Sequence, residues 1–133
     1  MSTRVFFDSN VLIYAYTQAA EKTARARELL SLGGIVSIQA LNETANTLRR
    51  RFFTDWPHIG QIVDSILSTC PNPMPLGLAT HRAASRICER HGFSFYDGLI
   101  LASAQEAGCE VLYTEDLQHG QVVQGVRIVN PFL

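Results

Sequence analysis

The chain has 133 residues, of which 47% are hydrophobic and 17% are charged, and its formal net charge is -1. A chain of this length forms one domain around one core, and its charge balance excludes a strongly basic protein that holds nucleic acid by overall charge. No apolar run approaches the roughly 20 residues of a membrane-spanning helix, so we expect no membrane partner.

In the first half of the chain, short apolar runs alternate with helical patterns. Residues 5–7 form a predicted strand that stops at Asp8-Ser9-Asn10, three residue types that cap helices well. In the helix over 21–32 we expect Ala24, Leu29 and Leu30 to face inward. The predicted helices of this half cover 11–16, 21–32, 39–53 and about 57–69, and a second short strand covers 35–38.

The second half repeats the alternation after a proline-rich connection at residues 70–75. Helices are predicted over 80–91 and 96–107, and strands over 110–114 and 126–129. Parallel strands need crossover connections, which helices usually supply. We therefore predict one α/β domain over residues 1–133, in which helices flank both faces of a short parallel sheet.

Four acidic residues share one position relative to these elements, although they are far apart in the chain. Each follows a predicted strand or lies near the start of a predicted helix: Asp8, Glu43, Asp97 and Asp116. Such positions converge at the carboxyl edge of a parallel sheet, where α/β folds bind ligands, so we expect one site. Singly, each acid also has a structural explanation, as a helix cap, a turn residue or a solvated side chain.

The four acids have no obvious basic partner beside them in the sequence. Two carboxylates about 4 Å apart repel each other by roughly 1 to 4 kcal/mol, and a divalent cation would remove that repulsion. An all-oxygen ligand set selects Mg²⁺, for which Mn²⁺ can substitute, rather than zinc or copper. The expected chemistry is phosphodiester hydrolysis by a metal-activated water.

Four segments together resemble the signature of the PIN-domain family: VFFDSNVLI at 5–13, NE at 42–43, FYDGLILA at 95–102 and LYTED at 112–116. The resemblance spans nearly the whole chain and implies a magnesium-dependent endonuclease of single-stranded RNA. The chain is most similar to the VapC-type toxins of prokaryotic toxin–antitoxin pairs. The implied partners are an RNA substrate, a small antitoxin protein and a second copy of the chain in a homodimer.

The resemblance assigns catalytic and metal-binding roles to the same four acids. Asp8, Glu43 and Asp97 match the three acids of the family's metal site. Asp116 matches the fourth acid, which is the most variable, and Glu115 is a rival for that role.

Neighbouring polar residues match supporting positions of the family. Ser9 or Asn10, together with Thr114, would orient a carboxylate or a water on the metal. His119 stands where some members carry another acid. We therefore predict one firmly held metal ion.

Two groups of arginines are candidate RNA-binding residues. Arg82, Arg86 and Arg90 recur every four residues on a predicted helix and would contact phosphates along an RNA groove. Arg49 opens a second cluster, at residues 49–51. The alternative is an ordinary solvated helix face, on which Glu89 pairs with Arg86.

The aromatic residues that follow this second cluster have two possible roles. Trp56 and the pair Phe52-Phe53 could stack on bases or form a groove for a partner. Core or dimer packing is the alternative interpretation.

Two other functions compete with the nuclease. A phosphatase of the haloacid dehalogenase kind also opens with an apolar strand ending in Asp, but it expects Asp at the position of Asn10 and a later lysine motif, which is absent. A catalytically idle PIN-like scaffold would bind RNA or protein without cleaving it. Intact acids at all four positions favour the enzyme.

The three cysteines indicate a cytoplasmic protein. Cys70, Cys88 and Cys109 are odd in number and widely spaced, which fits neither a disulfide framework nor a zinc site with paired ligands. The segment before Asp8 contains no long apolar stretch, so we expect no secretory signal.

Overall fold

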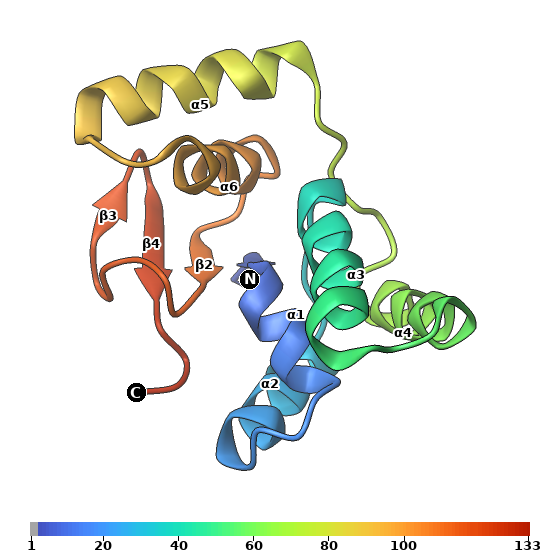
Figure 1. Cartoon of the computed structure of the whole chain (residues 1–133). Helices are drawn as coiled ribbons and strands as arrows, with labels where there is room; N and C mark the ends of the chain where they lie inside the picture. The colour runs from blue at the N-terminus through green and yellow to red at the C-terminus, as the bar shows by residue number, and fades with distance from the viewer. Residues whose placement is uncertain (1–2) are drawn as a thin grey trace.

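The computed structural model describes residues 3–133, so the first two residues of the segment in which we expect no secretory signal lie outside the described residues. Helices and strands alternate as predicted for an α/β fold (Figure 1). The elements, in chain order, are β1 (Val5–Phe7), α1 (Ser9–Ala15), α2 (Glu21–Ser31), α3 (Ile38–Phe52), α4 (Trp56–Thr69), α5 (Leu78–His91), α6 (Phe95–Glu106), β2 (Val111–Tyr113), β3 (Val122–Val123) and β4 (Val126–Val129).

The sheet has the strand order β1-β2-β4-β3. β1 pairs in parallel with β2, from Val5 opposite Val111 to Phe7 opposite Tyr113, and β2 pairs in parallel with β4. β3 is antiparallel to β4. The predicted parallel sheet is therefore confirmed, with one antiparallel strand added at its edge.

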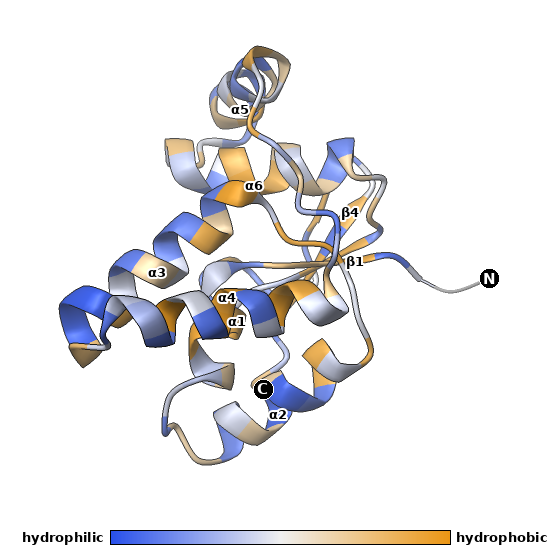
Figure 2. Ribbon diagram, turned by 90° about the vertical axis from the view of Figure 1, so that its right-hand side faces the viewer, coloured by the Kyte–Doolittle hydropathy of each residue, from blue (hydrophilic) through white to orange (hydrophobic). Residues whose placement is uncertain are grey.

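Helices cover both faces of this sheet. Neighbouring residues of a strand point to opposite faces, so β1 contributes side chains to two separate cores. Phe7 is fully buried in a core formed with α1, α2, α3 and α4. Phe6 is fully buried in a second core with α5, α6, β2 and β4. α6 is hydrophobic along much of its length (Figure 2), and its residues 98–104 are buried between α5 and the sheet.

The strand predicted over residues 35–38 is wrong in extent. Only Ile35 bridges to β1, opposite Phe6, and Ser37 bridges to Met74 on another segment. Ser37 also caps α3, since its hydroxyl accepts a hydrogen bond from the Ala40 amide at 3.0 Å. The helix therefore begins at Ile38 and leaves no room for a longer strand.

The sequence analysis missed β3, which forms a hairpin with β4 through a two-residue turn. Both turn residues have positive φ, 48° at Gln124 and 84° at Gly125. Tight hairpins require this backbone, and Asn-Gly or Asp-Gly is its usual signal. Gln-Gly at this position gives a weaker signal.

Two further predictions concern side chains. Ala24 is exposed, and the buried alanine of α2 is Ala26, so the predicted inward face was wrong at that residue. The three cysteines are free thiols, as predicted from their spacing. Within residues 3–133, no helix combines the length and apolar character needed to cross a membrane.

Candidate active site

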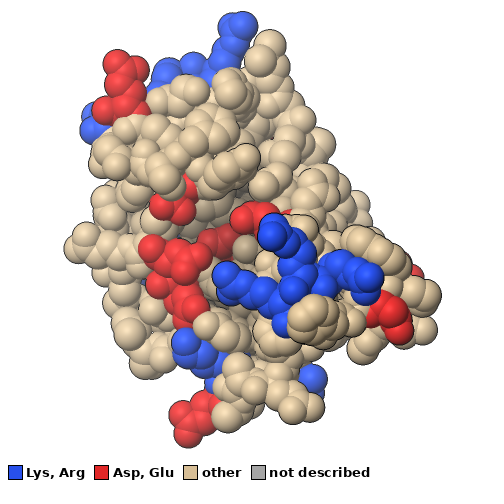
Figure 3. Space-filling model, in the orientation of Figure 1, with Lys and Arg blue, Asp and Glu red and all other residues tan. Residues whose placement is uncertain are grey.

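The four predicted acids come from four different elements that meet at the carboxyl edge of β1 and β2. Asp8 follows β1 directly, and Asp116 lies three residues beyond the end of β2. Glu43 lies in the second turn of α3, and Asp97 is the third residue of α6. In the space-filling view, acidic side chains gather near the middle of the molecule in a hollowed region (Figure 3).

Asp8 is the most buried of the four acids, with 9% of its surface exposed. Its Oδ1 accepts a hydrogen bond from the Ser9 amide at 2.7 Å. Asp8 therefore is the N-cap of α1, the structural role that the sequence also allowed. Its Oδ2 accepts a hydrogen bond from the Thr114 hydroxyl at 2.8 Å. The cap and the site therefore use the same carboxylate.

Asn10 and Thr114 connect Asp8 to Asp116. The Asn10 Nδ2 atom lies 3.4 Å from Asp8 Oδ2, 3.0 Å from Thr114 Oγ1 and 3.2 Å from Asp116 Oδ2, and it donates to all three oxygens. Thr114 Oγ1 also accepts a hydrogen bond from the Asp116 amide at 3.1 Å. One amide and one hydroxyl thus orient two carboxylates from opposite ends of the chain.

The acids interact electrostatically. Burial raises the pKa of Asp8 most strongly, hydrogen bonds from Thr114 and Ser9 lower it, and the charges of Asp116 and Asp97 raise it again, so that it lies above its ordinary value. Burial raises the pKa of Glu43, and the charges of the other three acids raise it further. Within residues 3–133 the ion pairs are Lys22–Glu115 and Arg25–Glu28, so none of the four acids has a basic partner.

Glu115, the rival for the fourth acid, takes part in a different cluster. It accepts hydrogen bonds from the Tyr14 hydroxyl and from Lys22 Nζ, the latter at 2.9 Å. Burial raises the pKa of Glu115, but these hydrogen bonds and the charge of Lys22 outweigh it, so the pKa lies below its ordinary value. Asp116 is therefore the residue of this pair that joins the acidic site.

Gly98 positions Asp97 by allowing α6 to approach α5 closely. A Cβ at this position would lie 2.4 Å from Cys88 Sγ and 2.9 Å from the Ala84 carbonyl oxygen. Ser94 is the N-cap residue of α6, and its side chain makes no cap hydrogen bond. Asp97 is thus held by helix packing, and within residues 3–133 its carboxylate forms no ion pair.

The chemistry of this donor set fits a hard divalent cation, because every donor is an oxygen and the acids repel one another. The four carboxylates do not form a closed cage. Among residues 3–133, no three Asp, Glu, His or Cys side chains are grouped closely enough to hold a metal ion by themselves. An ion bound here would therefore keep part of its water shell, as Mg²⁺ usually does.

His119 lies outside this arrangement. Its Nδ1 atom accepts a hydrogen bond from the Asn130 amide at 2.9 Å, which ties the segment after β2 to the end of β4. The imidazole therefore has a structural contact on a different part of the chain from the four acids.

The predicted arginines occupy two separate surfaces. Arg82, Arg86 and Arg90 are exposed on α5, and Arg86 forms no ion pair with Glu89 in the described chain. In Figure 3, basic side chains over α5 are separated from the central acids by uncharged surface, whereas a basic group over the end of α3 borders them.

Within this second group, Arg49 turns away from the acids. It donates a hydrogen bond to the Thr54 carbonyl oxygen at 3.3 Å, and its guanidinium lies 5.7 Å from the centre of the Trp56 ring. Arg51 instead lines a cleft with Asn10 and Asp116. The run of three arginines was a visible signal, but it did not show which of them faces the site.

The sequence pattern of the PIN domain family matches residues 5–123. A comparison with curated proteins gives no match. The chain is similar in structure to a toxin–antitoxin complex from Klebsiella pneumoniae, with a TM-score of 0.72 and 21% identity over 96% of this chain and 98% of that one.

Two further solved structures share the fold. VapC20 from Mycobacterium tuberculosis, described as a sarcin-ricin loop cleaving toxin, has a TM-score of 0.68 and 18% identity over 84% of this chain and 89% of its own. VapBC2 from Rickettsia felis, bound to a DNA fragment from its promoter, has a TM-score of 0.69 and 15% identity over 95% of this chain and 97% of that one.

Proposed function

This chain belongs to the PIN domain family, and we propose that it is a Mg²⁺-dependent endoribonuclease that cleaves single-stranded RNA as the toxin of a toxin–antitoxin pair. The observation that carries the proposal is the convergence of four carboxylates at one sheet edge without a basic partner in the described chain. Family membership supports a nuclease. One protein with this fold is described as a sarcin-ricin loop cleaving toxin.

In this proposal Asp8, Glu43, Asp97 and Asp116 are the residues that would hold the cation, since all four offer carboxylate oxygens. The chemistry that such a cation would supply is a nucleophilic water and a positive charge to offset the negative charge of the phosphodiester. Mn²⁺ has the same preference for oxygen ligands and should substitute.

The protein's own contribution is to aim and space these carboxylates. Asn10 and Thr114 hold the carboxylates of Asp8 and Asp116 close to each other through the hydrogen bonds described above. The side-chain amide of Asn10 donates hydrogen bonds to these two acids. Asn10 stands where haloacid dehalogenase-like phosphatases carry a second Asp, and here it orients the carboxylates. Asp97 is fixed by the packing of α6 on α5.

Cleavage of a single-stranded RNA in Mg²⁺ or in chelator tests the activity. We expect fragments with 5′-phosphate ends in Mg²⁺ only, and their loss in folded Asp8→Asn and Asp97→Asn proteins. Asp64→Asn removes an exposed acid on α4 and should leave cleavage unchanged. Equal cleavage by the Asp8 and Asp97 variants would overturn the site, and RNA binding without cleavage by the wild type would favour the idle scaffold.

We also propose a small antitoxin partner, a homodimer and action in the cytoplasm, where the RNA substrates are. The similarity to solved toxin–antitoxin complexes supports the antitoxin. Expression of the chain should arrest growth, and the reading frame immediately upstream should rescue it. Growth arrest that no neighbouring frame relieves would argue for a stand-alone nuclease.

A further inference from the structure

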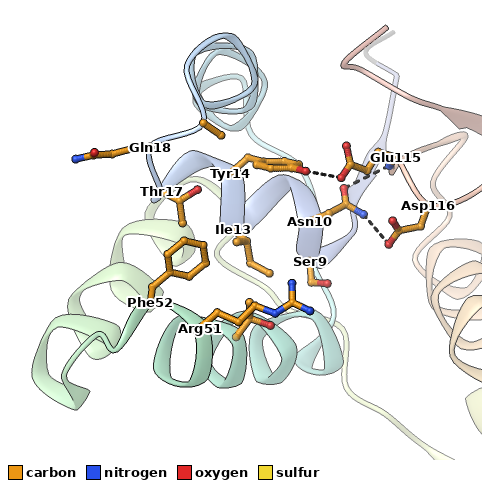
Figure 4. Close-up of a pocket in the computed structure, with 12 residues that line it drawn as sticks. Ser9, Asn10, Ile13, Tyr14, Thr17, Gln18, Arg51, Phe52, Glu115 and Asp116 are labelled. Atoms are coloured by element: carbon orange, nitrogen blue, oxygen red, sulfur yellow. Dashed lines mark hydrogen bonds between the residues drawn. The ribbon is translucent and has the colours of Figure 1, made fainter.

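A cleft of about 600 Å³ adjoins the acidic site, which occupies one end of it through Asp116 (Figure 4). Its volume falls in the range of ligand sites, roughly 300 to 1,000 Å³. α1 contributes residues spaced one turn apart, and the last turns of α3 contribute the facing side. The residues that define these two sides are Ser9 and Ile13 from α1 with Thr17 just beyond its end, and Thr47, Arg51 and Phe52 from α3.

Arg51 supplies an uncommitted positive charge to this cleft. Its guanidinium extends toward Ser9 in Figure 4, and within residues 3–133 its side chain forms neither a hydrogen bond nor an ion pair. Its neighbour Arg49 is engaged with Thr54 and Trp56 instead. A free guanidinium beside a cluster of carboxylates can bind a phosphate that the acids themselves repel.

Phe52 supplies an aromatic surface next to this charge. It is 51% exposed, and its ring lies in the cleft near Thr17 (Figure 4). Phe53 is 82% exposed but does not line the cleft, because the chain leaves α3 there in a left-handed conformation with φ of 55°. A half-exposed ring among hydroxyl and amide groups is suited to stacking against a base.

We propose that this cleft binds one nucleotide of single-stranded RNA beside the phosphodiester that is cut, with its phosphate on Arg51 and its base on Phe52. The inference rests on the proposed nuclease function and adds the path of the substrate. The mixed lining favours a nucleotide, since Arg51 fits phosphate, Phe52 fits the base, and Ser9, Thr17 and Thr47 can contact the sugar. Continuity with Asp116 places this nucleotide next to the acids.

Fluorescence anisotropy of a labelled random-sequence oligoribonucleotide tests this path in Mg²⁺. All proteins carry Asp97→Asn, so that the RNA stays intact. Arg51→Ala should weaken binding about fivefold or more and lower the salt dependence by about 0.7 in log Kd per log salt, the value for one phosphate contact on a single strand. Phe52→Ala should weaken binding about fivefold or more without changing that slope, because stacking is uncharged.

Matched controls separate the cleft from the general surface. Arg127→Ala removes an exposed charge on β4, and Phe53→Ala removes the neighbouring aromatic, and both should bind within twofold of the parent. Phe52→Tyr should restore binding. The Phe52→Ala loss should vanish with an oligonucleotide of abasic residues.

Unchanged RNA affinity in folded Arg51→Ala and Phe52→Ala proteins would overturn the inference. Loss of binding to a co-expressed protein, with RNA binding intact, would also overturn it and assign the cleft to a protein partner. Absence of cleavage by the wild type, with the predicted binding losses present, would refute the nuclease and leave the nucleotide site standing. The two failures are thus distinguishable.

Discussion

Replacement of Asp116 by Asn should stabilise the protein in chelator and weaken its response to Mg²⁺. Asn10 Nδ2 lies 3.4 Å from Asp8 Oδ2 and 3.2 Å from Asp116 Oδ2, so these two oxygens are at most about 7 Å apart. Two negative charges at about 7 Å repel by about 0.6 kcal/mol in water and about 2.4 kcal/mol at an effective dielectric constant of 20. Asp116 is exposed and Asp8 is buried, so we expect about 1 kcal/mol.

The substitution removes the charge and keeps an oxygen that can accept the Asn10 hydrogen bond. In chelator, the melting temperature should therefore rise by about 3 to 6 °C for a domain of this size. A concentration of Mg²⁺ about 100 times its Kd stabilises the wild type by about 2.7 kcal/mol, and the variant should gain clearly less.

Glu115→Gln is the matched control, because it removes the adjacent acid but breaks contacts with Lys22 and Tyr14. It should lower the melting temperature in chelator and leave the response to Mg²⁺ intact. Differential scanning calorimetry with and without Mg²⁺ measures both effects. A less stable Asp116→Asn protein in chelator, or an equal gain from Mg²⁺ in all three proteins, would refute the assignment of Asp116.

Three other predictions follow from packing and hydrogen bonding. In a urea titration, Gly98→Ala should lower the free energy of unfolding by about 1 to 3 kcal/mol, and it should also reduce cleavage, because the added Cβ would push α5 away. The control Gly60→Ala lies on an open helix surface and should raise the free energy of unfolding by up to about 1 kcal/mol. Ser103→Ala should be neutral or stabilise by about 1 kcal/mol in urea unfolding, because the buried Ser103 hydroxyl has no hydrogen-bond partner within residues 3–133. A loss above about 1 kcal/mol would show that it has one. The pKa of Glu115 is lowered in the folded protein, so this acid stabilises the fold above its unfolded pKa and loses that effect as the pH falls through its folded pKa. The stability difference between wild type and Glu115→Gln, at most about 1 kcal/mol at pH 7, should therefore shrink toward pH 3, and a difference independent of pH would contradict the ion-pair explanation.

The sequence by itself determined the fold class and where the acids meet. Asp8 ends a three-residue apolar strand, and parallel strands place their carboxyl ends at one edge, so this local pattern was enough to bring Asp8 and Asp116 together. It did not determine how far the strand at Ile35 extends or that β3 pairs with β4. The first depends on where α3 begins, and the second on the uncommon turn residue Gln124.

Only the tertiary structure decided which of several equivalent residues face the site. Glu115 and Asp116 are adjacent acids, and a contact with Lys22, 93 residues away in the chain, draws one of them out of the cluster. Arg49 and Arg51 are likewise indistinguishable in sequence, but two positions along a helix rotate a side chain by about 200°, given about 3.6 residues per turn. Local sequence fixes the element on which a side chain lies, and the packing of distant elements fixes the side chains that it meets.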